Sequence, residues 1–164
     1  DSISVRWIHL MTEELPVTTQ PVTWLDFLTD DGVLLDDRLD RWEAFVSDKP
    51  QVECPLTHTY PEGLYVREIF APAGSIITSL IHKFDHPFFL LRGKLTVISE
   101  TEGLVTYTAP MYGITLPQTR RAILIQEDTV WVTVHPNPLN KKNHEEIRND
   151  LTYVRSNKYL LCLG

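Results

Sequence analysis

Residues 74–97 read GSIITSLIHKFDHPFFLLRGKLTV, and this stretch decides the fold class. It contains strand-length runs rich in Ile, Thr, Phe and Val, which are separated by the turn signals Asp85-His86-Pro87 and Arg92-Gly93. Segments of the same kind continue on both sides of it and predict eight strands: Leu64–Phe70, Ser75–Lys83, Phe88–Leu91, Leu95–Glu100, Leu104–Ala109, Ile114–Leu116, Ala122–Gln126 and Thr129–His135. Since no helical pattern interrupts them, the sequence predicts an all-β fold, a single antiparallel β-barrel or jelly roll.

The segments that flank the strands predict two short helices. Apolar residues at spacings of three and four predict a helix near Asp37–Ser47, with Trp42 and Phe45 lying on the barrel. The run Asn143-His-Glu-Glu146 is a capping box that predicts a second helix near His144–Arg155. We therefore divide the chain into an N-terminal extended arm at 1–50, a β-barrel at 51–138, and a C-terminal helix and tail at 139–164.

Composition excludes several classes of function. The 164 residues include 15 Lys and Arg against 22 Asp and Glu, a net charge of −7, so no basic surface for nucleic acid is expected. Uninterrupted apolar runs are short, which predicts no membrane span. The two cysteines do not suggest a disulfide framework. The chain begins without Met and without a signal-peptide pattern, so we expect a trimmed N-terminus and no secretion through such a signal.

Histidines are the side chains that best suit chemistry in this sequence. His82 and His86 are four residues apart, so on a continuous strand both side chains would share a face. Their imidazoles suit a borderline divalent ion, and a stable site needs a third ligand. His135 is the best candidate for that ligand, and we rank Glu68 and Gln126 below it. Pleat parity puts His135 on the face of Trp131 and Thr133 without showing whether that face is inward.

The spacing of these residues resembles the first motif of the cupin superfamily. Gly74, His82 and Gly93 match the motif, while Leu80 stands at its first His and His86 at its Glu. In the second motif, which falls on 116–122, Ala122 stands at the ligand His. The resemblance implies a cupin-type barrel and a divalent metal (Zn, Fe, Mn or Ni), with the fourth ligand missing. A purely structural role for hydrogen-bonded histidines in a degenerate barrel is the competing interpretation.

A closer resemblance spans about 60–153 and is to small cupin-like proteins encoded by tailed bacteriophages. It rests on the run from Gly63 to Gly74, on Arg120-Arg121-Ala122, and on Glu127-Asp-Thr-Val-Trp-Val-Thr-Val-His135. It implies a structural or accessory protein, virion-associated and not an enzyme, found in the virion or the host cytoplasm. The alternative is a metal-dependent cupin enzyme, an oxygenase or isomerase, that uses His82 and His86.

Two further predictions concern partners. Arg120 and Arg121, with Tyr107 and Tyr112, could clamp an anionic ligand at the barrel mouth, although the arginines could instead neutralise the acidic arm. The arm carries large apolar residues that predict a homo-oligomer or contacts with other virion proteins, with folding back onto the same chain as the competing outcome. These residues are Trp7, Ile8, Leu10, Val17, Val22, Trp24, Leu25 and Phe27.

Overall fold

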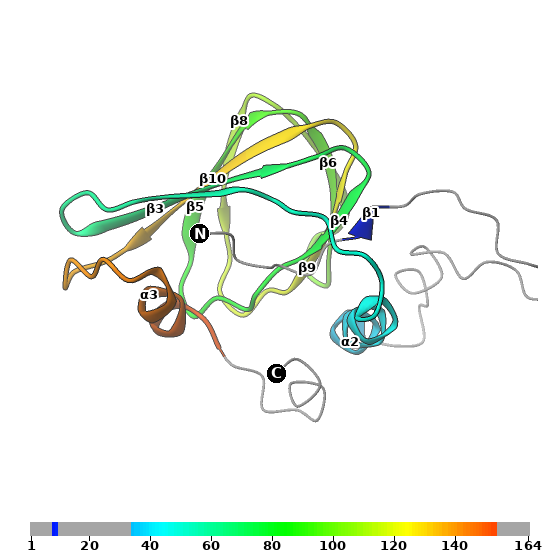
Figure 1. Ribbon diagram of the computed structural model, residues 1–164, viewed down its shortest axis with the longest axis horizontal. Coiled ribbons are helices and arrows are strands. Elements are labelled where there is room, and N and C mark those ends of the chain that lie inside the picture. Colours follow the sequence, from blue (N-terminus) through cyan, green and yellow to red (C-terminus); the bar gives the residue numbers. More distant parts are fainter. Residues whose placement is uncertain (1–7, 10–33, 154–164) are drawn as a thin grey trace, which may run out of the picture.

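The computed structural model describes residues 8–9 and 34–153, and it contains two five-stranded sheets that face each other (Figure 1). One sheet has the order β1-β4-β9-β6-β7 and the other β2-β3-β10-β5-β8, with every pairing antiparallel. The strands are β1 (Ile8–His9), β2 (Leu56–Thr59), β3 (Leu64–Ala71), β4 (Ser75–Thr78), β5 (His86–Arg92), β6 (Lys94–Ser99), β7 (Gly103–Thr108), β8 (Met111–Thr115), β9 (Arg121–Ile125) and β10 (Thr129–Pro136). The predicted all-β jelly roll is therefore confirmed, in the form of a two-sheet sandwich.

The core lies between the two sheets and consists of alternate residues from their inner faces. Its centre is aromatic, because the ring of Phe88 stacks on that of Trp131 with centroids 4.4 Å apart. Gly93 closes the β5–β6 hairpin with φ +94°, a conformation that glycine adopts readily. The buried core residues are Cys54, Ala71, Ile77, Phe88, Leu90, Leu95, Val97, Ile125 and Trp131.

Helix α2 (Leu35–Val46) covers the outer face of the sheet that contains β4, β6 and β9. Leu39 packs with Ala122, and Trp42 packs with Ile76. The predicted helix is therefore present, and Trp42 lies on the body as expected. Phe45 was expected there too, but it is 42% exposed because it lies at the edge of the buried stripe, against the ring of Trp42.

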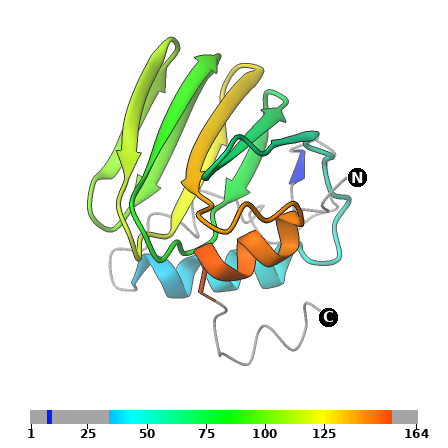
Figure 2. The ribbon, with the colours of Figure 1, turned by 90° about the vertical axis from the view of Figure 1, so that its left-hand side faces the viewer.

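Helix α3 (His144–Leu151) lies at the end of the sandwich where β10 finishes, and Figure 2 shows both helices at this end of the strands. Asn143 caps α3 by accepting hydrogen bonds from the backbone N–H groups of Glu145 and Glu146. Ile147 and Leu151 are buried against Tyr65. The helix ends at Leu151, four residues earlier than predicted, because Tyr153 donates its backbone N–H to Ile81 in an extended pairing.

Two predictions about elements need correction. The strand predicted over Ser75–Lys83 ends at Thr78, and His82 instead forms an isolated bridge with Thr152. β2 was not predicted, although it pairs with β3 along its whole length. The described parts of the arm, β1 and α2, pack on the same chain, and contact of the arm with a neighbouring chain stays a prediction.

Several sequence features fall outside the described residues. They include the arm residues Trp7, Leu10, Val17, Val22, Trp24, Leu25 and Phe27, together with Val154 and Cys162. Among the helices that are described, none has the length and apolar character needed to cross a membrane.

Candidate functional site

A cavity of about 390 Å³ opens at the end of the sandwich beside α3. The register of the strands shows which residues lie at the mouth of the cavity and which lie at its floor. His135 pairs with Tyr65 near the mouth, while Thr129 pairs with Ala71 at the floor. The residues that line the floor are mainly apolar: Ile69, Ala71, Ile77, Leu95, Ile123, Ile125 and Trp131. The polar residues gather at the mouth and include Arg67, Thr78, His82, His86, Thr115, Arg121 and His135.

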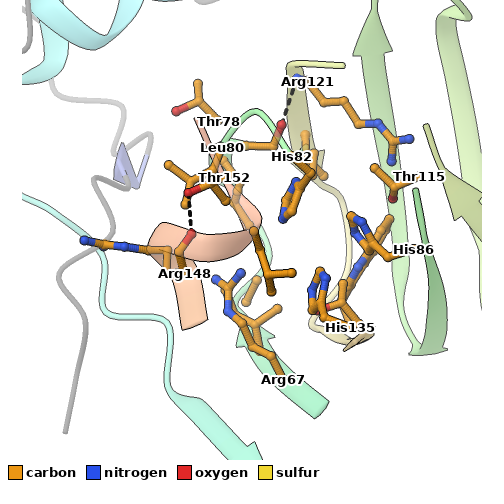
Figure 3. Close-up of a pocket in the computed structure, with 18 of the residues that line it drawn as sticks. Arg67, Thr78, Leu80, His82, His86, Thr115, Arg121, His135, Arg148 and Thr152 are labelled. Atoms are coloured by element: carbon orange, nitrogen blue, oxygen red, sulfur yellow. Dashed lines mark hydrogen bonds between the residues drawn. The ribbon is translucent and has the colours of Figure 1, made fainter. Parts of the chain in front are cut away.

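Three histidines converge at this mouth (Figure 3). The ligand nitrogens of His82, His86 and His135 all lie within 4.8 Å of one another. Ring centroids are 4.4 Å apart for His82 and His86, and 4.3 Å for His86 and His135. His86 and His135 are only 3% and 4% exposed, so both rings are held inside the protein. This is the three-residue set that the sequence predicted as metal ligands.

The three rings reach this point from different elements. His86 begins β5, and His135 lies near the end of β10, on the inward face with Trp131 and Thr133. His82 is not on a strand with His86, as the spacing argument assumed. The segment around His82 is held by the end of α3 and the residues after it. Lys83 donates its backbone N–H to the carbonyl of Leu151, and Tyr153 donates its backbone N–H to the carbonyl of Ile81.

Burial keeps the three imidazoles neutral. Desolvation is the main cause in each case: it lowers the pKa of His82 to about 3, that of His86 to about 4 and that of His135 to about 2. Neighbouring histidines also disfavour protonation of His82 and His135, and the guanidinium of Arg67 disfavours protonation of all three rings. The site therefore offers uncharged nitrogen lone pairs near neutral pH.

The hydrogen bonds of these rings suit metal coordination. Nδ1 of His86 lies 3.4 Å from the carbonyl oxygen of Phe84, and Nε2 of His135 lies 3.0 Å from Oγ1 of Thr133. Each contact leaves the other ring nitrogen available as a ligand. Nδ1 of His82 is buried and makes no hydrogen bond within the described part of the chain. Three neutral imidazoles fit Zn, Fe or Ni, and a three-ligand site leaves coordination positions open.

The structure does not bring the predicted anion clamp together. Arg121 lines the cavity, but the guanidinium of Arg120 binds carboxylates of α2. Its distances are 2.7 Å to Asp40 and 2.7 Å to Glu43. Arg120 thus neutralises the acidic segment, which was the alternative interpretation.

The two tyrosines of that clamp lie elsewhere. Tyr107 stacks on Phe88 and hydrogen-bonds Glu102, and Tyr112 is 74% exposed on β8. The two lower-ranked ligand candidates are not at the cavity either. Glu68 lies opposite Val132 on the outward parity of β3, and Gln126 donates to Thr96.

Sequence reasoning missed three cavity residues. Arg67 is on β3 with the inward parity of Tyr65 and Ile69, a pattern that could have identified it. Arg148 and His144 reach the cavity rim from α3. The ring of His144 also stacks on that of His58, with centroids 4.4 Å apart.

Comparisons with known proteins find similarity only among solved structures. No protein-family model matches the sequence, and no curated protein matches it. An RmlC-like cupin from Methanocaldococcus jannaschii is 12% identical over 56% of this chain and 87% of its own, with a TM-score of 0.45. A cupin-2 domain protein from Shewanella frigidimarina is 9% identical over 59% and 92%, with a TM-score of 0.42.

An acetylacetone dioxygenase from Acinetobacter johnsonii is also similar, with 24% identity over 54% of this chain and 66% of its own and a TM-score of 0.41. Two of these three similar structures are described as cupin proteins. The cupin resemblance and the phage source both stay predictions.

Proposed function

We propose that this chain is a metal-dependent cupin-type enzyme, of the oxygenase or isomerase kind, with His82, His86 and His135 as its metal ligands. The observation that carries the proposal is the convergence of three neutral imidazoles, two of them fully buried, at the mouth of a cavity. A divalent ion held there would supply Lewis-acid activation of a coordinated oxygen. No carboxylate belongs to the three-residue cluster, so the protein ligands themselves carry no charge.

The surrounding residues would hold and shield this centre. The Phe84 carbonyl and the Thr133 hydroxyl orient His86 and His135. Leu151 and Thr152 of the α3 segment line the cavity and restrict the entry of water. The apolar floor gives a substrate a dry surface next to the histidines, and such exclusion of water strengthens the electrostatic interactions of a site.

Metal titration tests the proposal. Protein stripped with a chelator is titrated with Zn²⁺, Ni²⁺, Fe²⁺ and Mn²⁺, and bound metal is measured by calorimetry and elemental analysis. We expect one ion per chain for at least one of these metals. His82→Ala, His86→Ala or His135→Ala should weaken binding by about tenfold or more.

The matched control is His144→Gln, which changes a histidine of the cavity rim outside the cluster. It should bind the metal like the unmodified protein. Circular dichroism checks that each variant is folded. The absence of stoichiometric metal, or equal losses in His144→Gln and the cluster variants, would contradict a metal centre.

A second candidate function is the structural one, a virion-associated phage protein that acts through contacts between chains. One observation favours such contacts: large apolar side chains lie exposed on the outer face of neighbouring strands β5 and β8. They are Phe89, Leu91, Tyr112 and Ile114. An exposed patch of this kind is typical of an interaction surface.

Light scattering tests this second candidate. If the outer face of β5 and β8 joins copies of the chain, Tyr112→Ser lowers the oligomeric state. Leu104→Ser, which removes an exposed leucine from β7 of the other sheet, is the matched control. A chain shortened to residues 34–164 tests the arm separately, since it keeps α2. A monomer at all concentrations contradicts self-association.

A further inference from the structure

The mouth of the cavity carries positive charge that no described carboxylate balances. Arg67 and Arg121 line the cavity, whereas Arg148, at the rim, turns its guanidinium away from the three histidines (Figure 3). Within residues 8–9 and 34–153, the ion pairs of the structure involve none of these three guanidinium groups. Glu43 is the cavity's carboxylate, and it is already engaged by Arg120 at 2.7 Å and by the Thr78 hydroxyl at 2.7 Å.

Arg121 is also deeply buried. The residue is 3% exposed, and its Nε atom finds no hydrogen-bond partner among the described residues. Its backbone N–H, by contrast, donates to Ser79 at 2.9 Å, so the main chain is fixed while the guanidinium is left for another partner. A buried cation without a counter-ion is costly, and an anionic ligand would remove that cost. Burial likewise lowers the pKa of Arg67.

The cavity combines this charge with an apolar interior. Below the histidines, the lining includes Ile69, Leu95 and Ile125, and the indole of Trp131 presents an aromatic surface backed by Phe88. A ligand that satisfied only the arginines would leave this floor uncovered. A ligand that covered only the floor would leave two guanidinium groups unpaired.

The size of the cavity limits the ligand further. A volume of about 390 Å³ lies at the lower end of the range for small-molecule sites, which is roughly 300–1,000 Å³. Side chains of α3, including Arg148 and Leu151, line its entrance. The space therefore suits a compact organic molecule and not a polymer segment.

We propose that the cavity binds a small organic acid, with its carboxylate at the buried guanidinium of Arg121 and its flat apolar body against Trp131. This rests on the proposed function only in making the acid the substrate of the three-histidine centre. The carboxylate matches the planar, bidentate donors of arginine, and the aromatic floor favours a ring or conjugated chain over an aliphatic ion.

Calorimetry with benzoate, benzamide, acetate and inorganic phosphate tests this inference on the full chain. Benzoate supplies charge and ring, benzamide the ring alone, acetate the charge alone, and phosphate an anion without an apolar body. We expect benzoate to bind at least tenfold more tightly than each of the others. Benzamide binding as well as benzoate would overturn the role of the arginines, and acetate or phosphate binding as tightly would overturn the role of the floor.

Variants locate the site. Arg121→Gln should weaken benzoate binding at least tenfold and more than Arg67→Gln does, while Arg92→Gln, which removes an exposed cation at the end of β5, should leave it unchanged. Unchanged benzoate affinity in Arg121→Gln would overturn the assignment. The comparison of benzoate with benzamide uses unmodified protein, so it stands even if one variant fails to fold.

The two proposals can fail separately. Benzoate discrimination that persists in chelated protein and in His82→Ala, with no metal bound to any form, would refute the metal centre and support the acid site. Stoichiometric metal without benzoate discrimination would refute the acid site and leave the metal centre intact.

Discussion

Acidification of the metal-free protein should destabilise it through the three buried histidines. An unfolded imidazole has a pKa of about 6.5, whereas burial lowers the pKa of His82, His86 and His135 to about 3, 4 and 2. The unfolded chain therefore binds more protons than the folded chain below about pH 6.5, and the free energy of unfolding falls as the pH falls. Above about pH 7 all three rings are neutral in both states, and this loss is absent.

The size of the effect follows from these values. One pH unit below the unfolded pKa, each ring costs about 1.4 kcal/mol, so the three together cost about 4 kcal/mol at pH 5.5. That is a large share of the 5–15 kcal/mol of a typical domain. Urea unfolding of chelated protein at pH 7.5 and 5.5 measures the difference. His135→Gln, which cannot be protonated, should reduce it by about 1.4 kcal/mol. A free energy of unfolding that is equal at both pH values, or an unchanged difference in His135→Gln, would refute the reasoning.

Three further substitutions test the fold by urea unfolding. Arg120→Ala removes the guanidinium that binds Asp40, a residue only 6% exposed, and should lower the free energy of unfolding by about 3–5 kcal/mol; a loss below about 1 kcal/mol would show that the pair is not structural. Gly93→Ala should lower the free energy of unfolding more than Gly63→Ala does. Both glycines have positive φ, but only at Gly93 would a Cβ lie within 2.6 Å of a backbone atom, so equal losses would contradict this reasoning. Asn143→Ala should cost about 1 kcal/mol by removing the cap of α3, and no change in the unfolding midpoint would argue against that cap.

The strands could be predicted because their signals are local. Alternation and turn residues mark β5 and β6, and Gly93 between them adopts the positive φ that a tight hairpin needs. The end of β4 could not be predicted in this way. After Thr78 the chain leaves the sheet and pairs with the end of α3 and the residues after it, through the hydrogen bonds from Lys83 to Leu151 and from Tyr153 to Ile81. No periodicity within 75–83 encodes a partner about seventy residues away.

The candidate site, too, could be predicted from the sequence only where the signal is local. Parity correctly grouped Trp131, Thr133 and His135, but the inward direction of that face depends on how the two sheets pack. Arg120 and Arg121 are adjacent in sequence and were assigned one role. Arg121 begins β9 and lines the cavity, whereas Arg120 precedes the strand and binds carboxylates of α2.

The departures from the cupin motif and the charge of the cavity have a common physical consequence. Leu80, at the position of the motif's first His, is 46% exposed at the rim, and Ala122, at the second motif's His, is buried under α2 on the outer face. The residue that faces inward beside it is Arg121. A centre with three neutral ligands would leave a divalent ion uncompensated, and the nearby guanidinium adds further positive charge instead of neutralising it. Both charges favour an anion supplied from outside the chain, which is consistent with the proposed binding of a small organic acid in this cavity.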